Sequence, residues 1–181
     1  MTATDAKPST EIQQAELTRI YNLYRDSLLS KKYYAHKVAE WKRIDLWINI
    51  VAALASSSVF TGLALWKTQF GLNFMTFLTL AAAVVAILKP IIRPAEKIDR
   101  YSKLHFAYSE VYLDFDSLIA DIRRQTELDP DRLKRSFQIW DRYRQLALQD
   151  DPEPNRKLLE KFQAEVNEFL PPDRLWLPSA Q

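Results

Sequence analysis

Residues 46–88 read LWINIVAALASSSVFTGLALWKTQFGLNFMTFLTLAAAVVAIL, and this stretch decides the fold. Lys67 is its only charged residue. A bilayer core about 30 Å thick requires roughly 20 apolar residues in a helix that rises about 1.5 Å per residue. Residues 46–66 meet this requirement and residues 70–88 also suffice, so the sequence predicts two membrane-spanning helices. Because only a tight turn fits between them, they form an antiparallel hairpin.

A buried helical hairpin inside a soluble protein is the alternative. It requires a large shell of amphipathic partners around two helices that are apolar all round, whereas the rest of the chain is charged and apolar on one face only. The aromatic residues favour the membrane. Trp41 and Trp47 lie at one boundary of the stretch, and Trp66 and Phe70 at the other, where amphipathic rings prefer the headgroup level.

Basic residues gather on one side of the predicted hairpin. They precede the first span and follow the second: Lys31, Lys32, Lys37, Lys42, Arg43, Lys89, Arg93, Lys97, Arg100 and Lys103. The turn offers Lys67 alone, so the positive-inside rule places both termini in the cytoplasm. Residues 1–40 contain no apolar run of the length that a secretory signal needs.

One long helix is predicted ahead of the first span. Residues 1–9 lack apolar periodicity and are expected to form a mobile arm. Thr10 and Gln13 fit a capping box, so the helix begins there, and no glycine or proline follows before Gly62. An apolar stripe recurs at three- and four-residue steps, and Ser27 and Lys31 interrupt it at a natural place for a bend. Its members are Leu17, Ile20, Tyr24, Tyr34, Val38 and Trp41.

A second long helix is predicted after the hairpin. Pro90 and Pro94 should kink or restart the chain as it leaves the membrane, and they are the expected hinge. Residues 95–128 then contain neither glycine nor proline. Their apolar residues occupy strict a and d heptad positions: Tyr101, Leu104, Tyr108, Val111, Phe115, Leu118 and Ile122. This helix should pair antiparallel with the helix that precedes the hairpin.

Residues 129–181 are predicted to form cytoplasmic C-terminal helices and a tail. Asp129 and Pro130 are a typical helix start, and the first of these helices should bury Leu133, Phe137 and Trp140. A break at residues 150–155 precedes the last amphipathic helix, whose apolar residues are Leu158, Leu159, Phe162, Val166, Phe169 and Leu170. The proline-rich tail carries Trp176, which should dock on the helices.

The sequence holds no catalytic constellation. His36 and His105 lack the spacing of a metal site, and there is no cysteine. With two glycines, Gly62 and Gly71, no phosphate-binding loop can form. Asp114 and Asp116 lie on different helix faces, which excludes a carboxylate pair. We therefore expect no enzyme and no cofactor, and a net charge of +2 gives no support for nucleic-acid binding.

Polar and small residues inside the spans are the candidate functional residues. Asn49, Ala53 and Ser56 share one face of the first span, and that face is a candidate pore lining or helix contact, as are Asn73 and Thr76 in the second. The alternative is that the hydroxyls bond their own helix carbonyls and the small residues only pack. A second open question concerns the cytoplasmic arginines, which either bind an anion or decorate a solvated face: Arg123, Arg124, Arg132, Arg135, Arg142 and Arg144.

The arrangement over about residues 21–125 resembles the SLATT family of two-transmembrane domains from bacterial nucleotide-signalling and antiphage systems. The matching segments are YNLYRDSLLSKKYYAHKVAEWKR, two closely spaced spans, RPAEKIDRYSKLH and YSEVYLDFDSLIADIRR. The resemblance implies a SLATT-like domain at residues 10–128 that forms a homo-oligomeric inner-membrane effector. Such an effector permeabilises the membrane when a separate defence-system sensor or a nucleotide signal triggers it.

Two function classes follow from the sequence. The first is a pore-forming effector, and the second is a non-conducting membrane anchor or scaffold whose cytoplasmic helices recruit a partner. A pore requires a polar stripe that faces its own symmetry axis, whereas a scaffold does not. The stripe at Asn49 and Ser56 favours the pore.

Overall fold

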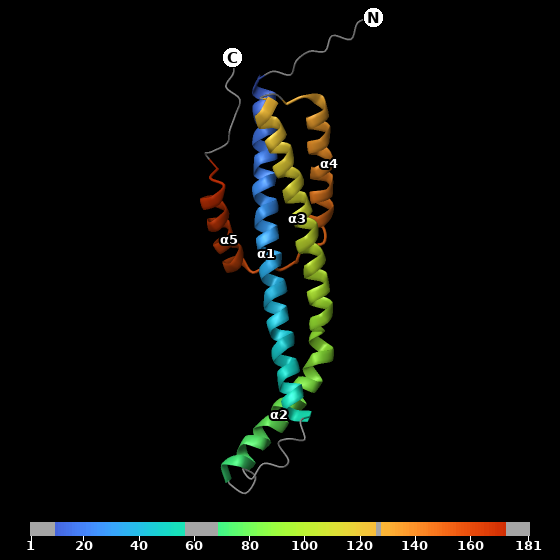
Figure 1. Ribbon diagram of the computed structural model, residues 1–181, viewed down its shortest axis with the longest axis vertical. Coiled ribbons are helices and arrows are strands. Elements are labelled where there is room, and N and C mark those ends of the chain that lie inside the picture. The colour runs from blue at the N-terminus through green and yellow to red at the C-terminus, as the bar shows by residue number, and fades with distance from the viewer. Residues whose placement is uncertain (1–9, 57–68, 126–127, 173–181) are drawn as a thin grey trace, which may run out of the picture. The chain divides into compact units, whose positions relative to one another are not determined.

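The computed structural model describes residues 10–56, 69–125 and 128–172. These residues form five α-helices and no strand: α1 (Thr10–Ser56), α2 (Gln69–Ile92), α3 (Pro94–Gln125), α4 (Pro130–Ala147) and α5 (Arg156–Phe169) (Figure 1). The prediction of an all-α fold is confirmed, as is a first helix that begins at Thr10. Within the described ranges, none of the helices combines the length and the apolarity that crossing a bilayer demands.

Several predicted features lie outside the described residues. They are the arm at residues 1–9, the second half of the first predicted span at residues 57–66, the turn at residues 67–68 and the tail that carries Trp176. The predictions made for them stay predictions.

The chain divides into two compact units. The first comprises Met1–Ala35 and Ser102–Gln181, and the second comprises His36–Tyr101. The first unit therefore holds the start of α1, most of α3, and α4 and α5, while the second holds the end of α1, all of α2 and the start of α3.

The heptad stripe of α3 is the best-buried feature of the described chain. Its members are all buried, and Tyr108, Phe115 and Leu118 have no exposed surface at all (0%). Its second half, from Val111 to Ile122, forms one apolar cluster in the first unit with residues of α1 such as Leu17 and Ile20. The predicted stripe, and its need for a partner along its length, is thereby confirmed.

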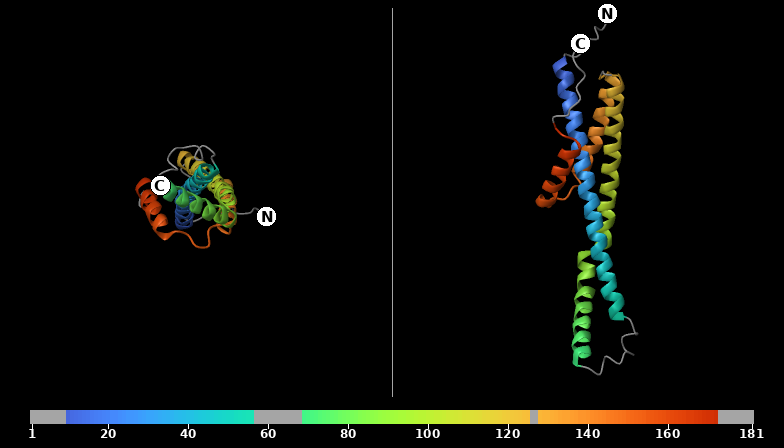
Figure 2. Two further views of the ribbon diagram at one scale, coloured as in Figure 1. Left: turned by 90° about the horizontal axis from the view of Figure 1, so that it is seen from below. Right: turned by 60° about the vertical axis from the view of Figure 1, so that its left-hand side comes forward.

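The partner of α3 is α1, and the two helices run antiparallel (Figure 2). The ring of Tyr24 stacks on that of Tyr112 with centroids 4.9 Å apart. Further along α1, the ring of Tyr34 stacks on that of Tyr108 at 5.6 Å. Because the later residue of α1 meets the earlier residue of α3, the predicted antiparallel pair is confirmed.

The two short helices flank this pair, with α4 beside α3 and α5 beside α1 (Figures 1 and 2). Asp129 caps α4 as predicted, its carboxylate accepting from the backbone N–H of Arg132 at 2.8 Å. Asn155 caps α5 in the same way, accepting from the backbone N–H of Leu158 at 3.2 Å. Ile139 of α4 joins the apolar cluster, and Lys32 of α1 bonds Glu165 of α5 at 2.7 Å.

Three burial predictions are wrong. Ser27 does not interrupt the α1 stripe, because it is fully buried (0%) and its hydroxyl donates to the Tyr24 carbonyl at 2.7 Å. Phe137 and Phe169 are exposed. On α4 the buried residues are instead Ser136 and Ile139, so the buried face lies one residue before the expected positions Phe137 and Trp140.

Replacing Phe115 by alanine should destabilise the first unit by about 3–5 kcal/mol, because a fully buried ring leaves a cavity. The measurement is thermal or denaturant unfolding of the full chain in detergent micelles, followed by circular dichroism. Phe106→Ala is the matched control, since the same residue type on the same helix is 65% exposed there. Its effect should stay within about 0.5 kcal/mol. Equal effects of the two variants would contradict the assignment of the buried face.

Candidate functional site

A backbone break separates α2 from α3 in the second unit. α2 ends at Ile92 and α3 begins at Pro94, and Arg93 between them adopts a positive φ of 47°. This left-handed conformation costs a residue with a Cβ about 1–2 kcal/mol, and it interrupts the helix at Arg93. The Arg93 N–H still donates to the Lys89 carbonyl at 3.0 Å, and the Arg93 carbonyl accepts from Glu96 at 3.1 Å. The predicted restart of the helix at the two prolines is confirmed.

Asn49 lies in a polar cluster that joins α1 to α2. Its amide donates to the Asp45 carboxylate at 3.0 Å, one turn earlier on α1. Its carbonyl oxygen accepts from the Lys89 ammonium of α2 at 3.0 Å. Asn49 thus has partners on both sides within one chain, and it sits between a negative and a positive group.

The spacing of this contact fits the predicted hairpin. Asn49 and Lys89 are 40 residues apart, and their midpoint is Gln69, the first residue of α2. In an antiparallel helical hairpin, residues that face each other lie at equal distances from the turn.

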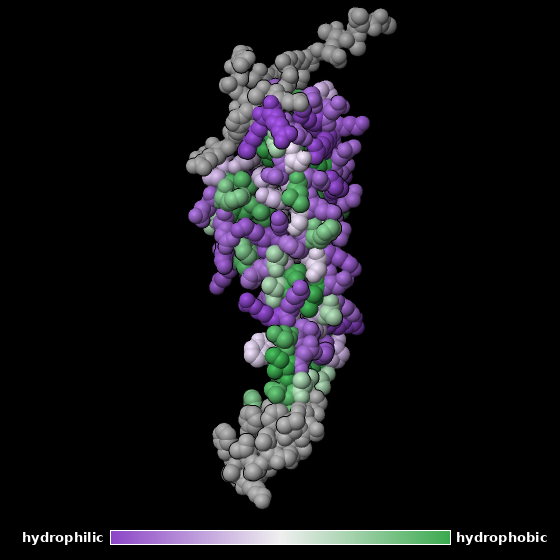
Figure 3. All heavy atoms as spheres, in the orientation of Figure 1, coloured by the Kyte–Doolittle hydropathy of each residue, from purple (hydrophilic) through white to green (hydrophobic). Residues whose placement is uncertain are grey.

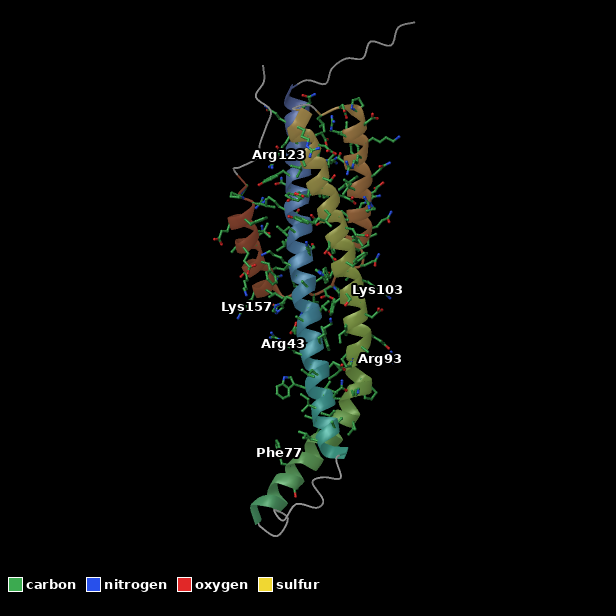
Figure 4. All side chains as sticks on the ribbon, viewed as in Figure 1. Arg43, Phe77, Arg93, Lys103, Arg123 and Lys157 are labelled. Carbon is green, nitrogen blue, oxygen red and sulfur yellow. The ribbon has the colours of Figure 1, made fainter. Side chains whose placement is uncertain are left out.

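Among the described side chains of α2, five large apolar ones share one exposed face. Phe77, which Figure 4 labels on α2, is 69% exposed, and Ile91 is 70% exposed. Figure 3 shows hydrophobic residues at the surface next to the grey residues at its lower end. The members recur at alternating three- and four-residue steps: Phe77, Leu80, Val84, Ile87 and Ile91. At 100° per residue they share one stripe. Thr76, Ala83 and Ala86 are exposed on a neighbouring face, so α2 separates large from small residues.

The end of α1 also carries its large exposed residues on one face and smaller exposed residues on another. Its exposed large residues share one face: Leu46, Trp47, Ile50 and Leu54. Asn49 and Ala53 are exposed on an adjacent face, one turn apart. Of the other candidate residues, the side chains of Ser56 and Asn73 lie outside the described part of the structure. Pro90 is exposed and Pro94 is buried.

The first unit holds a separate network of tyrosines around the α4–α5 connection. Tyr34 and Tyr108 both donate to one Asp150 carboxylate oxygen, each at 2.8 Å. Burial raises the pKa of both phenols well above the usual value, and the bond to Asp150 adds to that effect. Burial, with the nearby charges of Asp26 and Asp150, raises the pKa of Tyr143 to about 12. These hydroxyls stay protonated near neutral pH, and those of Tyr34 and Tyr108 anchor the connection through Asp150.

The arginines of α4 are engaged with acids. Arg132 forms an ion pair with Asp129 at 2.6 Å, and Arg142 forms one with Asp114 at 2.6 Å. Arg135 bonds Asp121 at 3.0 Å and Arg144 bonds Asp141 at 3.2 Å. Any anion would have to compete with these carboxylates, which supports the interpretation of a solvated, paired face.

The aspartates of α3 confirm that no carboxylate pair forms. Asp114 faces α4 through Arg142, whereas Asp116 accepts from the Tyr24 hydroxyl of α1 at 2.8 Å. Groups of three or more metal-ligating side chains are absent among the residues that the structure describes.

Sequence reasoning missed the partners of Asn49. Asp45 lies four residues before it, a spacing that would have indicated the contact. Lys89 was counted only as a flanking charge, and its contact with Asn49 depends on the register between α1 and α2. Sequence reasoning also missed that Arg93, rather than a proline, carries the unusual backbone conformation.

The Asn49–Lys89 contact predicts a coupling energy between the two positions. Both residues are exposed in the single chain, so we expect about 0.5–1 kcal/mol in a double-mutant cycle of Asn49→Ala and Lys89→Met. Unfolding in detergent micelles is the measurement. Asn49→Ala combined with Arg124→Met provides the matched control and should be additive within about 0.3 kcal/mol. Additivity of the first pair as well would show that α1 and α2 do not meet there.

No family model, curated protein or solved structure matches the chain. The likeness to the SLATT family therefore rests on the arrangement of residues quoted above and stays a prediction. What the protein does has to be inferred from its own residues.

Proposed function

We propose that this protein is a homo-oligomeric effector of the bacterial inner membrane. Residues 46–66 and 70–88 form its two spans, both termini are cytoplasmic, and several copies together permeabilise the bilayer. A defence-system sensor or a nucleotide signal acts as the trigger.

The exposed large side chains of α1 and α2 are the observation that carries the proposal. Leu46 is 57% exposed, Trp47 65% and Ile87 65%, and the other members of the two faces range from 37% at Ile50 to 70% at Ile91. Each such side chain that stays in water lacks the stabilisation of about 1.5–3 kcal/mol that full burial would give. Contiguous apolar surface of this kind marks a lipid or protein contact. Because the polar backbone of a helix is satisfied internally, helices of this type suit a lipid surrounding.

The division of each helix into two faces supports a path between copies. In lipid, helices associate through small residues because the hydrocarbon supplies no hydrophobic drive. The large faces are therefore assigned to lipid. The small faces, with Ala53 on α1 and Ala83 and Ala86 on α2, are assigned to neighbouring copies. Asn49 and Ser56 share the small face of α1 and would line the water path, which one hairpin is too thin to enclose.

The break at Arg93 supports a route for the trigger. A rigid α3 begins at Pro94, and its far end is packed into the first unit. A sensor that moves the first unit would act on α2 through this junction, since backbone change concentrates where a helix is already interrupted.

A non-conducting scaffold is the second candidate, and one observation favours it. Asn49 is hydrogen-bonded by Asp45 and Lys89 within one chain, so its amide needs no aqueous path to be satisfied. The first unit also exposes large apolar side chains to which a cytoplasmic partner can bind: Phe106, Leu113, Leu148 and Phe169.

Ion flux through liposomes that contain the purified protein tests the proposal. The parent should release a trapped dye or dissipate an ion gradient, whereas Asn49→Leu and Ser56→Leu should each lower the rate about tenfold, which corresponds to about 1.4 kcal/mol in the barrier. Apolar side chains at those positions would dewet the path.

Ile50→Leu is the matched control, because it changes the large face one residue away from Asn49 and should leave flux unchanged. Oligomer size should be the same for all variants. If the parent enters the liposomes and conducts nothing, with or without its trigger, the scaffold function replaces the pore.

A further inference from the structure

We propose that the second unit carries a belt of basic side chains that binds anionic phospholipid headgroups in preference to zwitterionic ones. The belt comprises Lys42, Arg43, Lys89, Arg93 and Lys97. The inference rests on the proposed membrane function, and it goes further by naming the lipid class that the protein selects.

The charge of the second unit is unbalanced. Its described residues carry seven basic and four acidic side chains, although the whole chain has a net charge of only +2. Lys42, Arg43 and Lys97 make no ion pair within residues 10–56, 69–125 and 128–172. Lys89 donates to the neutral amide of Asn49 and so keeps its net charge. Arg93 meets Glu96 at 3.3 Å in a pair whose members are 64% and 68% exposed, and such a pair is readily exchanged for another anion.

The basic residues stand at headgroup depth beside the apolar faces. Lys42 precedes the exposed Leu46 by four residues, which is about 6 Å along a helix. The polar region of a bilayer extends about 5–8 Å beyond the hydrocarbon on each side. Arg93 follows the exposed Ile91 by two residues, and the stem of Lys97 is long enough to bring its ammonium to the same level. Figure 4 shows Arg43 on α1 and Arg93 at the α2–α3 junction, so both arms of the unit contribute.

The size of the expected preference follows from the number of charges. A Lys or Arg near an anionic leaflet contributes roughly a fivefold factor in binding, and the contribution is screened within a Debye length of about 8 Å at physiological salt. Three unpaired side chains therefore predict a selectivity on the order of a hundredfold at low salt that shrinks as salt is added.

Tryptophan quenching in vesicles measures this preference. The full chain is reconstituted in phosphatidylcholine that contains an equal share of brominated phosphatidylglycerol or of brominated phosphatidylcholine. Trp47 is 65% exposed and adjacent to the belt, so its fluorescence is quenched by nearby brominated lipid. The variant Trp47→Phe shows how much of the total quenching comes from Trp47. We expect stronger quenching by phosphatidylglycerol in the parent.

A triple variant should lose the preference, so that both brominated lipids quench its tryptophan fluorescence equally. Its substitutions are Lys42→Gln, Arg43→Gln and Lys97→Gln. Arg123→Gln, Arg124→Gln, Lys157→Gln removes the same charge from exposed sites of the first unit and should behave like the parent. Equal quenching of the parent by both lipids would overturn the belt while leaving the membrane function intact. Absence of quenching by either lipid would overturn the membrane function and the belt with it.

Discussion

Burial of one face of α3 against α1 is the interaction on which the first unit depends. The heptad positions from Leu104 to Ile122 remove a continuous stripe of apolar surface from water, and Ile139 of α4 joins the cluster that the positions from Val111 onward form with α1. A helix that is apolar on one face needs one protein partner, and α3 has it. The second unit differs. There the end of α1 and the helix α2 each expose a face of large apolar residues that no described residue covers.

Two polar networks are satisfied inside the single chain. Tyr34 and Tyr108 converge on Asp150, and Asn49 is held between Asp45 and Lys89. Satisfied networks rigidify a structure, since removing one member leaves the others desolvated. The tyrosine network therefore rigidifies the first unit around the α4–α5 connection, whereas the backbone break at Arg93 lies within the second unit.

Much of this fold follows from the sequence. The heptads of α3, the Asp129 cap and the antiparallel α1–α3 pair are each determined by local spacing, and each was predicted. Phe137 was not predicted correctly, because its ring lies 4.7 Å from the Arg19 guanidinium at the surface, and a cation–π contact leaves no periodic signal. The prediction for Ser27 was wrong for a related reason. A serine that is buried because its hydroxyl bonds a carbonyl of its own helix cannot be told by spacing from a polar residue that interrupts the stripe. The contact of Lys89 with Asn49 depends on the register between two helices, which no single helix encodes.

We propose that residues 46–88 enter the bilayer as a hairpin with both ends on the cytoplasmic side. The chain has no native cysteine, so Thr68→Cys and Ser117→Cys each supply a single labelling site. A membrane-impermeant maleimide added to intact spheroplasts should label Thr68→Cys, and should label Ser117→Cys only after the membrane is permeabilised. Labelling of both sites from the same side would contradict the hairpin.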